Sequence, residues 1–408
     1  MELLSPAGGP DQFQAAMNFG ADAVYLGGGS FGLRERADKF TVEQIGQAIQ
    51  EAHARGKKVY VTVNALMHPN DTDSLRTYME NLQELGADAM IISDLGAVAV
   101  AREAAPDVAI HISTQASCTN AEAAKMWHAL GAKRVVLARE LTLEEIKVLR
   151  SKIPADLEIE CFVHGAMCVA YAGRCLISDY LVGRDANRGN CSQPCRWSYT
   201  LQEESRKGQM FPIEEDGKSS YILSSTDMCM IEHLQELADA GVDSIKIEGR
   251  MKGAYYVASV TNAYRKVLDG EDPAKYLPEL ETVSHRPYST GFYYGKPGQN
   301  YDGAEYTQTC DYVGMVVSSK ETDHSTWEIG VDLRNRFFFE DTLEAISAQY
   351  GVLTNLPILT LNHANGYPVA AADRTRNIYL FETNKPLNVG DYLRRPRAQA
   401  WEKEKPGE

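Results

Sequence analysis

A short phrase that recurs along the first 250 residues constrains the fold more than any other feature of this sequence. In each copy a Gly stands a few residues before a short, mainly apolar run, as in residues 19–26, 85–92, 130–137 and 240–247. Glycine has no Cβ and accepts the left-handed conformation in which helices commonly end. The phrase therefore predicts repeated helix-to-strand transitions, which are typical of β-α units and a parallel sheet.

Eight candidate strands follow from this pattern. They start near Glu2, Ala23, Val59, Ala89, Ala109, Arg134, Leu157 and Ser244. Eight β-α units over about 260 residues match the size of a TIM-type (β/α)8 barrel. A doubly wound open sheet is the alternative, and the strand count and even unit length favour the barrel. Before the third strand, Thr41 and Gln44 fit a capping box, which predicts a helix that ends at Gly56.

In a TIM barrel the functional groups lie at the carboxyl ends of the strands. We predict Arg139, His164, Glu248 and Arg250 as catalytic residues that line one cavity there. The two arginines suit a small dicarboxylate, because a guanidinium binds a carboxylate through two hydrogen bonds. In the alternative interpretation, Glu248 and Arg250 only form a salt bridge.

The sequence pattern changes after residue 285, where alternating apolar and polar residues replace the helical period. We therefore predict three parts: a barrel over 1–285 with a hairpin inserted at about 198–222, a connection over 286–309, and a C-terminal β domain over 310–400. The last part is expected to be a small all-β, barrel-like domain.

The charge and the N-terminal residues predict where the protein works. Neither a targeting segment nor an apolar run of membrane-spanning length is apparent, so we expect a soluble, cytoplasmic protein without membrane contact. A net charge of −15 argues against a general nucleic-acid binder but leaves room for a local basic face. The candidate basic face consists of arginines in the terminal domain: Arg334, Arg336, Arg374, Arg376, Arg394, Arg395 and Arg397.

Cysteines are concentrated in one segment. Five of the eight lie between 161 and 195, among Gly, Pro, Asn and Arg residues, whereas Cys118 and Cys310 stand alone. Four thiolates hold either a zinc ion or an iron–sulfur cluster. Of these thiols, only Cys191 and Cys195 have a spacing like that of a zinc knuckle. The wide spacing from Cys168 to Cys175 favours a cluster over one ion.

The cysteine segment resembles the signature of the collagenase-like peptidase family U32. The resemblance rests on residues 160–178, 187–196, 225–237 and 246–252, and on the opening residues 2–8. It covers almost the whole chain. It implies a [4Fe-4S] cluster on Cys168, Cys175, Cys191 and Cys229, with Cys195 as the other candidate for the fourth ligand.

The resemblance also implies an activity. Similar members are bacterial tRNA hydroxylation proteins, so we expect an enzyme that converts the wobble uridine of tRNA to 5-hydroxyuridine with prephenate as co-substrate. The alternatives are a collagenase-like peptidase, which is a hydrolase, and a non-catalytic RNA-binding module. We see no zincin motif and no convincing serine or cysteine dyad, and both absences weaken the peptidase hypothesis.

Overall fold

The computed structural model describes most of the chain as two compact units. The described residues are 1–28, 31–33, 40–168, 170–197, 200–202, 210–212, 226–295, 297 and 306–397. The first unit comprises residues 1–13, 21–252 and 285–306, and the second comprises 14–20, 253–284 and 307–408. The units interleave along the chain, and the predicted domain borders at 285 and 310 stay a prediction.

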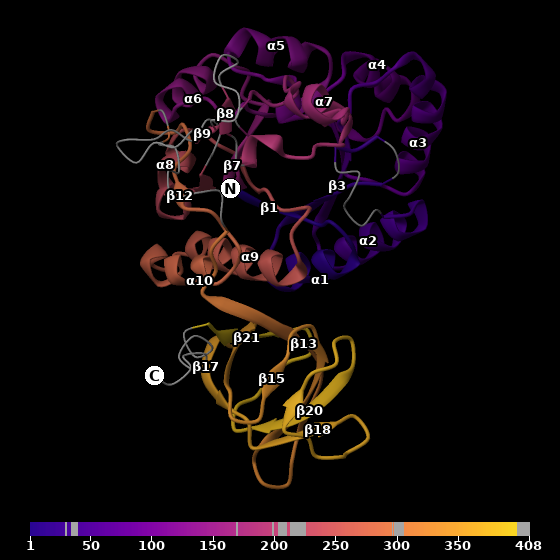
Figure 1. Ribbon diagram of the computed structural model, residues 1–408. Coiled ribbons are helices and arrows are strands. Elements are labelled where there is room, and N and C mark those ends of the chain that lie inside the picture. The colour runs from indigo at the N-terminus through magenta and orange to yellow at the C-terminus, as the bar shows by residue number, and fades with distance from the viewer. Residues whose placement is uncertain are drawn as a thin grey trace. The chain divides into compact units, whose positions relative to one another are not determined.

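In the described part of the first unit, eight parallel strands form a closed barrel (Figure 1). They are β1 (Glu2–Pro6), β2 (Ala23–Leu26), β3 (Lys58–Val63), β4 (Ala89–Ile92), β5 (Ala109–Ile112), β6 (Ala132–Val136), β7 (Glu158–Ala166) and β11 (Ser244–Ile247). Strand β11 closes the ring, because Ser244 pairs with Glu2 of β1 on one side and with Glu160 of β7 on the other. The TIM-type prediction is confirmed.

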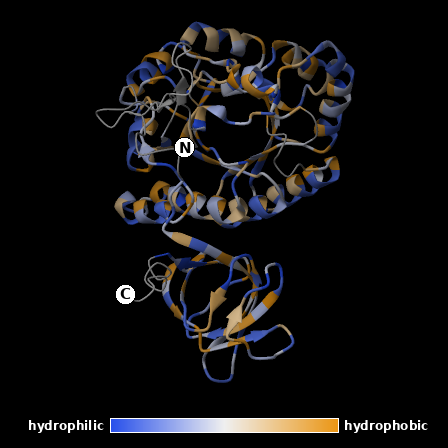
Figure 2. Cartoon of the chain, in the orientation of Figure 1, coloured by the Kyte–Doolittle hydropathy of each residue, from blue (hydrophilic) through white to orange (hydrophobic). Residues whose placement is uncertain are grey.

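Helices surround this ring (Figure 1). They include α2 (Val42–Ala54), α3 (Thr72–Glu84), α4 (Leu95–Ala104), α5 (Ala121–Ala129) and α6 (Leu143–Arg150). The capping box at Thr41 and Gln44 forms as predicted, and Gly56 follows the end of α2 with φ 66°. The helices carry both apolar and polar bands (Figure 2), as expected for helices that cover a core on one face. No helix in the described residues is both long and apolar enough to cross a bilayer.

A long insertion separates β7 from β11. It contains α7 (Ile177–Val182), the short helices η3 (Ala186–Arg188) and η4 (Pro194–Arg196), and β10 (Asp227–Cys229). In the predicted hairpin, β8 (Thr200–Gln202) pairs antiparallel with β9 (Met210–Pro212), and its other residues from 198 to 222 lie outside the described part. Strand β10 pairs antiparallel with the end of β7 and parallel with β12 (Tyr288–Ser289), outside the closed ring.

In its described residues the second unit holds a seven-stranded antiparallel sheet and two helices, α9 (Ala254–Leu268) and α10 (Leu277–Glu281). The sheet order is β17 (Gly351–Pro357), β16 (Thr342–Ser347), β21 (Tyr392–Pro396), β13 (Cys310–Glu321), β14 (Trp327–Leu333), β20 (Ile378–Thr383) and β18 (Thr360–His363). Its core includes Val316, Ile329, Phe337 and Phe381, all fully buried. The prediction of a C-terminal β domain is confirmed, and the structure shows that its seven-stranded sheet is antiparallel.

Candidate functional site

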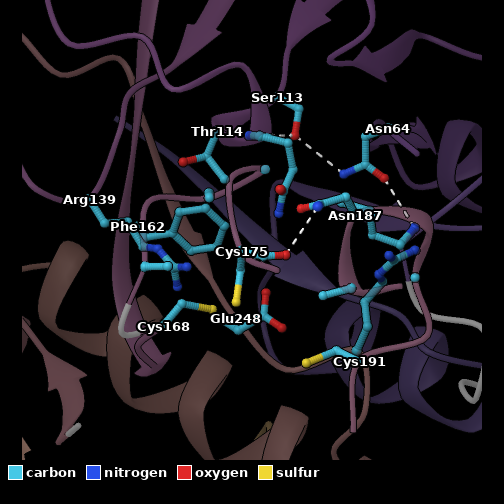
Figure 3. A pocket seen from close by; sticks show the side chains of 18 of the residues that line it. Asn64, Ser113, Thr114, Arg139, Phe162, Cys168, Cys175, Asn187, Cys191 and Glu248 are labelled. Atoms are coloured by element: carbon cyan, nitrogen blue, oxygen red, sulfur yellow. Dashed lines mark hydrogen bonds between the residues drawn. The ribbon is translucent and has the colours of Figure 1, made fainter. Parts of the chain in front are cut away.

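A cavity of about 170 Å³ lies in the first unit, where the barrel strands end (Figure 3). The carboxyl ends of the strands contribute Asn64, Ser113, Arg139 and Glu248, and the inserted segment contributes the thiols. Polar and charged side chains therefore gather at the carboxyl ends of the strands, which is where TIM-barrel enzymes have their active sites.

Three of the predicted metal ligands share this cavity. Cys168, Cys175 and Cys191 line it, and Figure 3 shows their side chains around the same space as Glu248. Cys195 lines it as well, whereas Cys229 is buried on β10 and is not among the lining residues. Burial raises the pKa of the Cys195 thiol, and the neighbouring Cys168, Cys191 and Cys175 act in the same direction. The structure thus gathers the thiols of 168, 175, 191 and 195 around one cavity.

Cysteine thiolates are ligands of both zinc ions and iron–sulfur clusters. Among the described residues, no group of three or more His, Cys, Asp or Glu side chains is arranged to hold one metal ion. A structural zinc site brings four donors to about 2.0–2.3 Å from one ion. An iron–sulfur cluster is larger, and its thiolates bind different iron atoms. Thiols that line one cavity have the ligand chemistry of such a cluster, and both the cluster and the identity of its fourth ligand stay predictions.

One hydrogen bond from the barrel, donated by Ser117, and one within the inserted segment, donated by Asn187, hold the cysteine segment at the cavity. Ser117 Oγ donates to the Ala172 carbonyl at 2.7 Å, and Asn187 Nδ2 donates to the Cys175 carbonyl at 3.1 Å. Gly173 adopts φ +77°, and a Cβ at this position would lie 2.2 Å from the carbonyl oxygen of Gln115. Only glycine permits that approach without a shift of the backbone.

Cationic side chains outnumber carboxylates in the described lining of the cavity although the protein is acidic, and one of them, Lys246, is paired with the buried Glu160. The described lining includes one carboxylate, that of Glu248, and four cations: Arg139, Arg196, Lys246 and Arg250. Arg139 Nη1 donates to the Ala166 carbonyl at 3.1 Å, and its guanidinium lies 5.3 Å from the ring centre of Phe162. Burial acts to lower the pKa of Arg139, but the adjacent Cys168, Glu248 and Glu140 outweigh it and raise the pKa. A fixed positive charge therefore stands beside the Cys168 thiol.

Arg250 is held in place by the barrel. Its Nη1 donates to Thr62 Oγ1 at 2.7 Å, and its side chain is buried. A Cβ on Gly27 would lie 2.3 Å from that nitrogen, so the glycine leaves the space that the guanidinium occupies. The Tyr25 hydroxyl lies 3.5 Å from Oε2 of Glu248. The structure thus brings the predicted Arg139, Glu248 and Arg250 together at one cavity, and their catalytic roles stay predictions.

Lys246 is a site residue that the sequence analysis did not identify. Its Nζ donates to Glu160 Oε1 at 2.8 Å and lies 4.4 Å from the ring centre of Tyr25. Glu160 is fully buried and also accepts from Arg134 Nη1 at 3.0 Å. The strand Ser244–Ile247 contained the signal, because a lysine between two buried isoleucines must face the barrel interior.

His164 does not line the cavity. It lies in a buried aromatic group, where its ring is 5.3 Å from Tyr288 and Tyr288 stacks on His285 at 4.3 Å. Burial, with help from His285 and Lys252, lowers the pKa of His164 to about 3, so the imidazole is neutral at pH 7. Strand β10 lies beside it, with Cys229 opposite His164. A catalytic role of His164 stays a prediction without support from the lining of the cavity.

Several arginines of the predicted basic face are bound to carboxylates. In the second unit, Arg394 is buried, with its Nη1 2.5 Å from Glu279 Oε2 and its Nε 2.8 Å from Glu344 Oε2. Arg334, Arg395 and Arg397 also form ion pairs with aspartates. A guanidinium neutralised in this way contributes little to an electropositive surface, so the candidate basic face is weaker than its sequence suggests.

Comparison with known proteins identifies similar sequences. Residues 8–303 match the model of peptidase family U32. The chain is 37% identical to tRNA hydroxylation protein P1 of Bacillus subtilis, over 97% of this chain and 94% of that one. It is 36% identical to tRNA hydroxylation protein P of Escherichia coli, over 91% and 92%. It is also 36% identical to the 23S rRNA 5-hydroxycytidine C2501 synthase of Escherichia coli, over 73% of this chain and 46% of that one.

Proposed function

This chain belongs to peptidase family U32, and on that premise we propose that it is an enzyme that hydroxylates a base of tRNA. Two relatives that match almost its whole length are tRNA hydroxylation proteins, and a third makes 5-hydroxycytidine in rRNA. The proposed product is 5-hydroxyuridine at the wobble position. The observation that carries the proposal is one cavity that combines several thiols with four cations.

The cations support an anionic co-substrate. Arg139 and Arg250 line the same cavity as Lys246, with Glu248 as the one carboxylate in the described lining. Guanidinium groups bind carboxylates through paired, charge-assisted hydrogen bonds. A dicarboxylate such as prephenate fits this charge pattern, and we propose it as the co-substrate. The role of these residues is to bind and orient the anion.

The thiols support an iron–sulfur cluster. Cys168, Cys175 and Cys191 would supply three ligands, and Cys229 or Cys195 would supply the fourth. A bound [4Fe-4S] cluster supplies electron transfer. Arg139 stands beside Cys168, and its positive charge favours the thiolate that a metal ligand requires.

The decisive experiment is nucleoside analysis of tRNA from cells that lack this protein and any paralogue that duplicates it. We expect 5-hydroxyuridine derivatives to be lost. Wild-type protein and a Cys118→Ala control should restore them, because Cys118 is buried away from the lining of the cavity. Cys168→Ala should not restore them.

Two other outcomes would favour the alternatives. Unchanged wobble uridines, together with purified protein that cleaves gelatin, would identify a peptidase. Binding of tRNA without any change in its nucleosides would identify a non-catalytic RNA-binding module. The thiols that line the cavity at the strand ends argue against the module, because binding RNA alone does not require them.

A further inference from the structure

A group of exposed apolar side chains lies beside the cavity. Tyr180 on α7 is 89% exposed, more than any other large apolar side chain in the described residues. Leu176, one turn earlier on the same face, is 69% exposed, and Tyr171 and Trp197 are about half exposed. Scattered exposed apolar residues are normal on a soluble protein, but a concentration of them marks a binding surface.

Arginines without carboxylate partners accompany these side chains. Among the described residues, Arg174 forms no ion pair, Arg184 donates to Asn190 Oδ1 at 2.7 Å, and Arg196 contacts only uncharged oxygens. This contrasts with Arg394 and Arg395 of the second unit, whose charges are neutralised by acids. Residues 171–197 contain four arginines and two aspartates, so this segment is positively charged in a chain of net charge −15.

We name this area the α7 surface, and it consists of Tyr171, Arg174, Leu176, Tyr180, Arg184 and Trp197. It is continuous with the cavity, because Tyr171 lines the cavity and is also exposed. Two hydrogen bonds of 3.0 Å between Ser178 and Ser192 connect α7 to the segment that precedes η4 and Trp197. A polymer that delivers one of its units into the cavity would lie across this surface.

We propose that the α7 surface is a stacking platform for unpaired bases of the RNA substrate that flank the base entering the cavity. The inference rests on the proposed function and adds the place where the RNA is held. Aromatic rings stack on bases, and arginines contribute both charge and stacking. A protein partner would also cover apolar side chains, but it would not need the two arginines without carboxylate partners, Arg174 and Arg184, that lie among them.

The test measures binding of a fluorescent RNA hairpin with an unpaired uridine-containing loop to the full-length protein by anisotropy. Tyr180→Ala should weaken binding about tenfold, and Tyr180→Phe should retain it, because the ring that stacks is kept. The matched control is Tyr367→Ala, which removes a tyrosine that is 70% exposed in the second unit. It should leave the affinity unchanged. A fully paired RNA duplex should show no difference between wild type and Tyr180→Ala.

Other results would overturn the proposal in distinguishable ways. If wild type and Tyr180→Ala bind the hairpin equally, the α7 surface is not the platform, while the proposed function stands. If wild type binds no RNA, both fail. If RNA affinity is unchanged but Tyr180→Ala alters the sedimentation of the protein, the surface is a contact between protein chains.

Discussion

At the scale of single residues, Glu160 connects the floor of the cavity to the interior of the barrel. Its carboxylate accepts from Lys246 and Arg134, and Arg134 also binds Glu2 at 2.6 Å. Burial acts to raise the pKa of Glu160, but Lys246 and Arg134 outweigh it and lower the pKa. The carboxylate is therefore charged at pH 7 and compensates two buried cations.

Glu160→Gln should therefore be strongly destabilising. It leaves Lys246 and Arg134 as buried cations without their shared anion, and breaking a buried ion pair costs about 3–5 kcal/mol. We expect the loss as a lower urea midpoint. The control is Glu144→Gln, which removes an exposed carboxylate paired with Lys147 at 2.7 Å and should leave the urea midpoint nearly unchanged, because solvent screens exposed ion pairs. Equal midpoints for the two variants would show that the network contributes no stability.

The same residue has a pH signature. Because the folded pKa of Glu160 is lowered relative to the unfolded chain, its contribution to stability is present above the unfolded value. That contribution is lost as the pH falls through the folded value. In wild type, stability should therefore fall in acid more steeply than in Glu160→Gln.

Single residues were predicted with uneven success. Arg139, Glu248 and Arg250 follow strands directly, so the rule for strand ends placed them at the cavity. His164 lies inside β7 rather than beyond it, and its side chain belongs to the aromatic group with Tyr288. Sequence position alone does not determine the direction of a side chain near the carboxyl end of a barrel strand. Lys246 was missed because it lies within a strand, where we looked for apolar residues.

At the scale of elements, the cysteine segment should bind iron through the thiols that line the cavity. Anaerobically purified protein should contain iron with acid-labile sulfide. Cys168→Ala, Cys175→Ala and Cys191→Ala should each lose most of the iron. Cys118→Ala should keep it. Comparing Cys195→Ala with Cys229→Ala identifies the fourth ligand, and stoichiometric zinc without sulfide would contradict the cluster.

The placement of that segment should depend on Gly173. In Gly173→Ala the new Cβ meets the Gln115 carbonyl at 2.2 Å, so the segment must move away from the barrel. We expect reduced iron content in metal analysis. The matched control is Gly183→Ala, which also has a positive φ of +64° but has nothing within 4 Å of the new Cβ. It should keep the iron, so loss of iron in both variants would trace the effect to backbone conformation alone.

The elements themselves were largely predictable. The barrel strands begin within two residues of their predicted starts, from β1 at Glu2 to β11 at Ser244, because they are short apolar runs and each one after β1 follows the end of a helix. Strand β10 was not predicted, since a run of Asp227–Cys229 is too short to carry an alternation. It owes its strand conformation to pairing with β7, which is a tertiary effect.

At the scale of the whole molecule, a net charge of −15 opposes the approach of RNA. Binding must then depend on local cations and should weaken steeply with salt. Replacing Arg174 by Gln should lower the magnitude of the slope of log K against log salt by roughly 0.7, the value for one phosphate of a single strand. The control is Arg397→Gln, because Arg397 is already paired with Asp311 at 2.9 Å. If Arg397→Gln changes the slope and Arg174→Gln does not, the terminal domain is the basic face.

The closure of the barrel through β11 also sets an order in time. Ser244 of β11 pairs with Glu2, which lies near the N-terminus. The inserted segment is synthesised after β7 and before β11. At translation rates of roughly 5–20 residues per second, the residues from the end of β7 to the end of β11 take about 4–16 s to appear. Every cysteine of the cavity therefore leaves the ribosome before the strand that completes the ring. During that interval the thiols of a nascent chain meet oxidants and iron donors without the enclosure that the finished barrel provides.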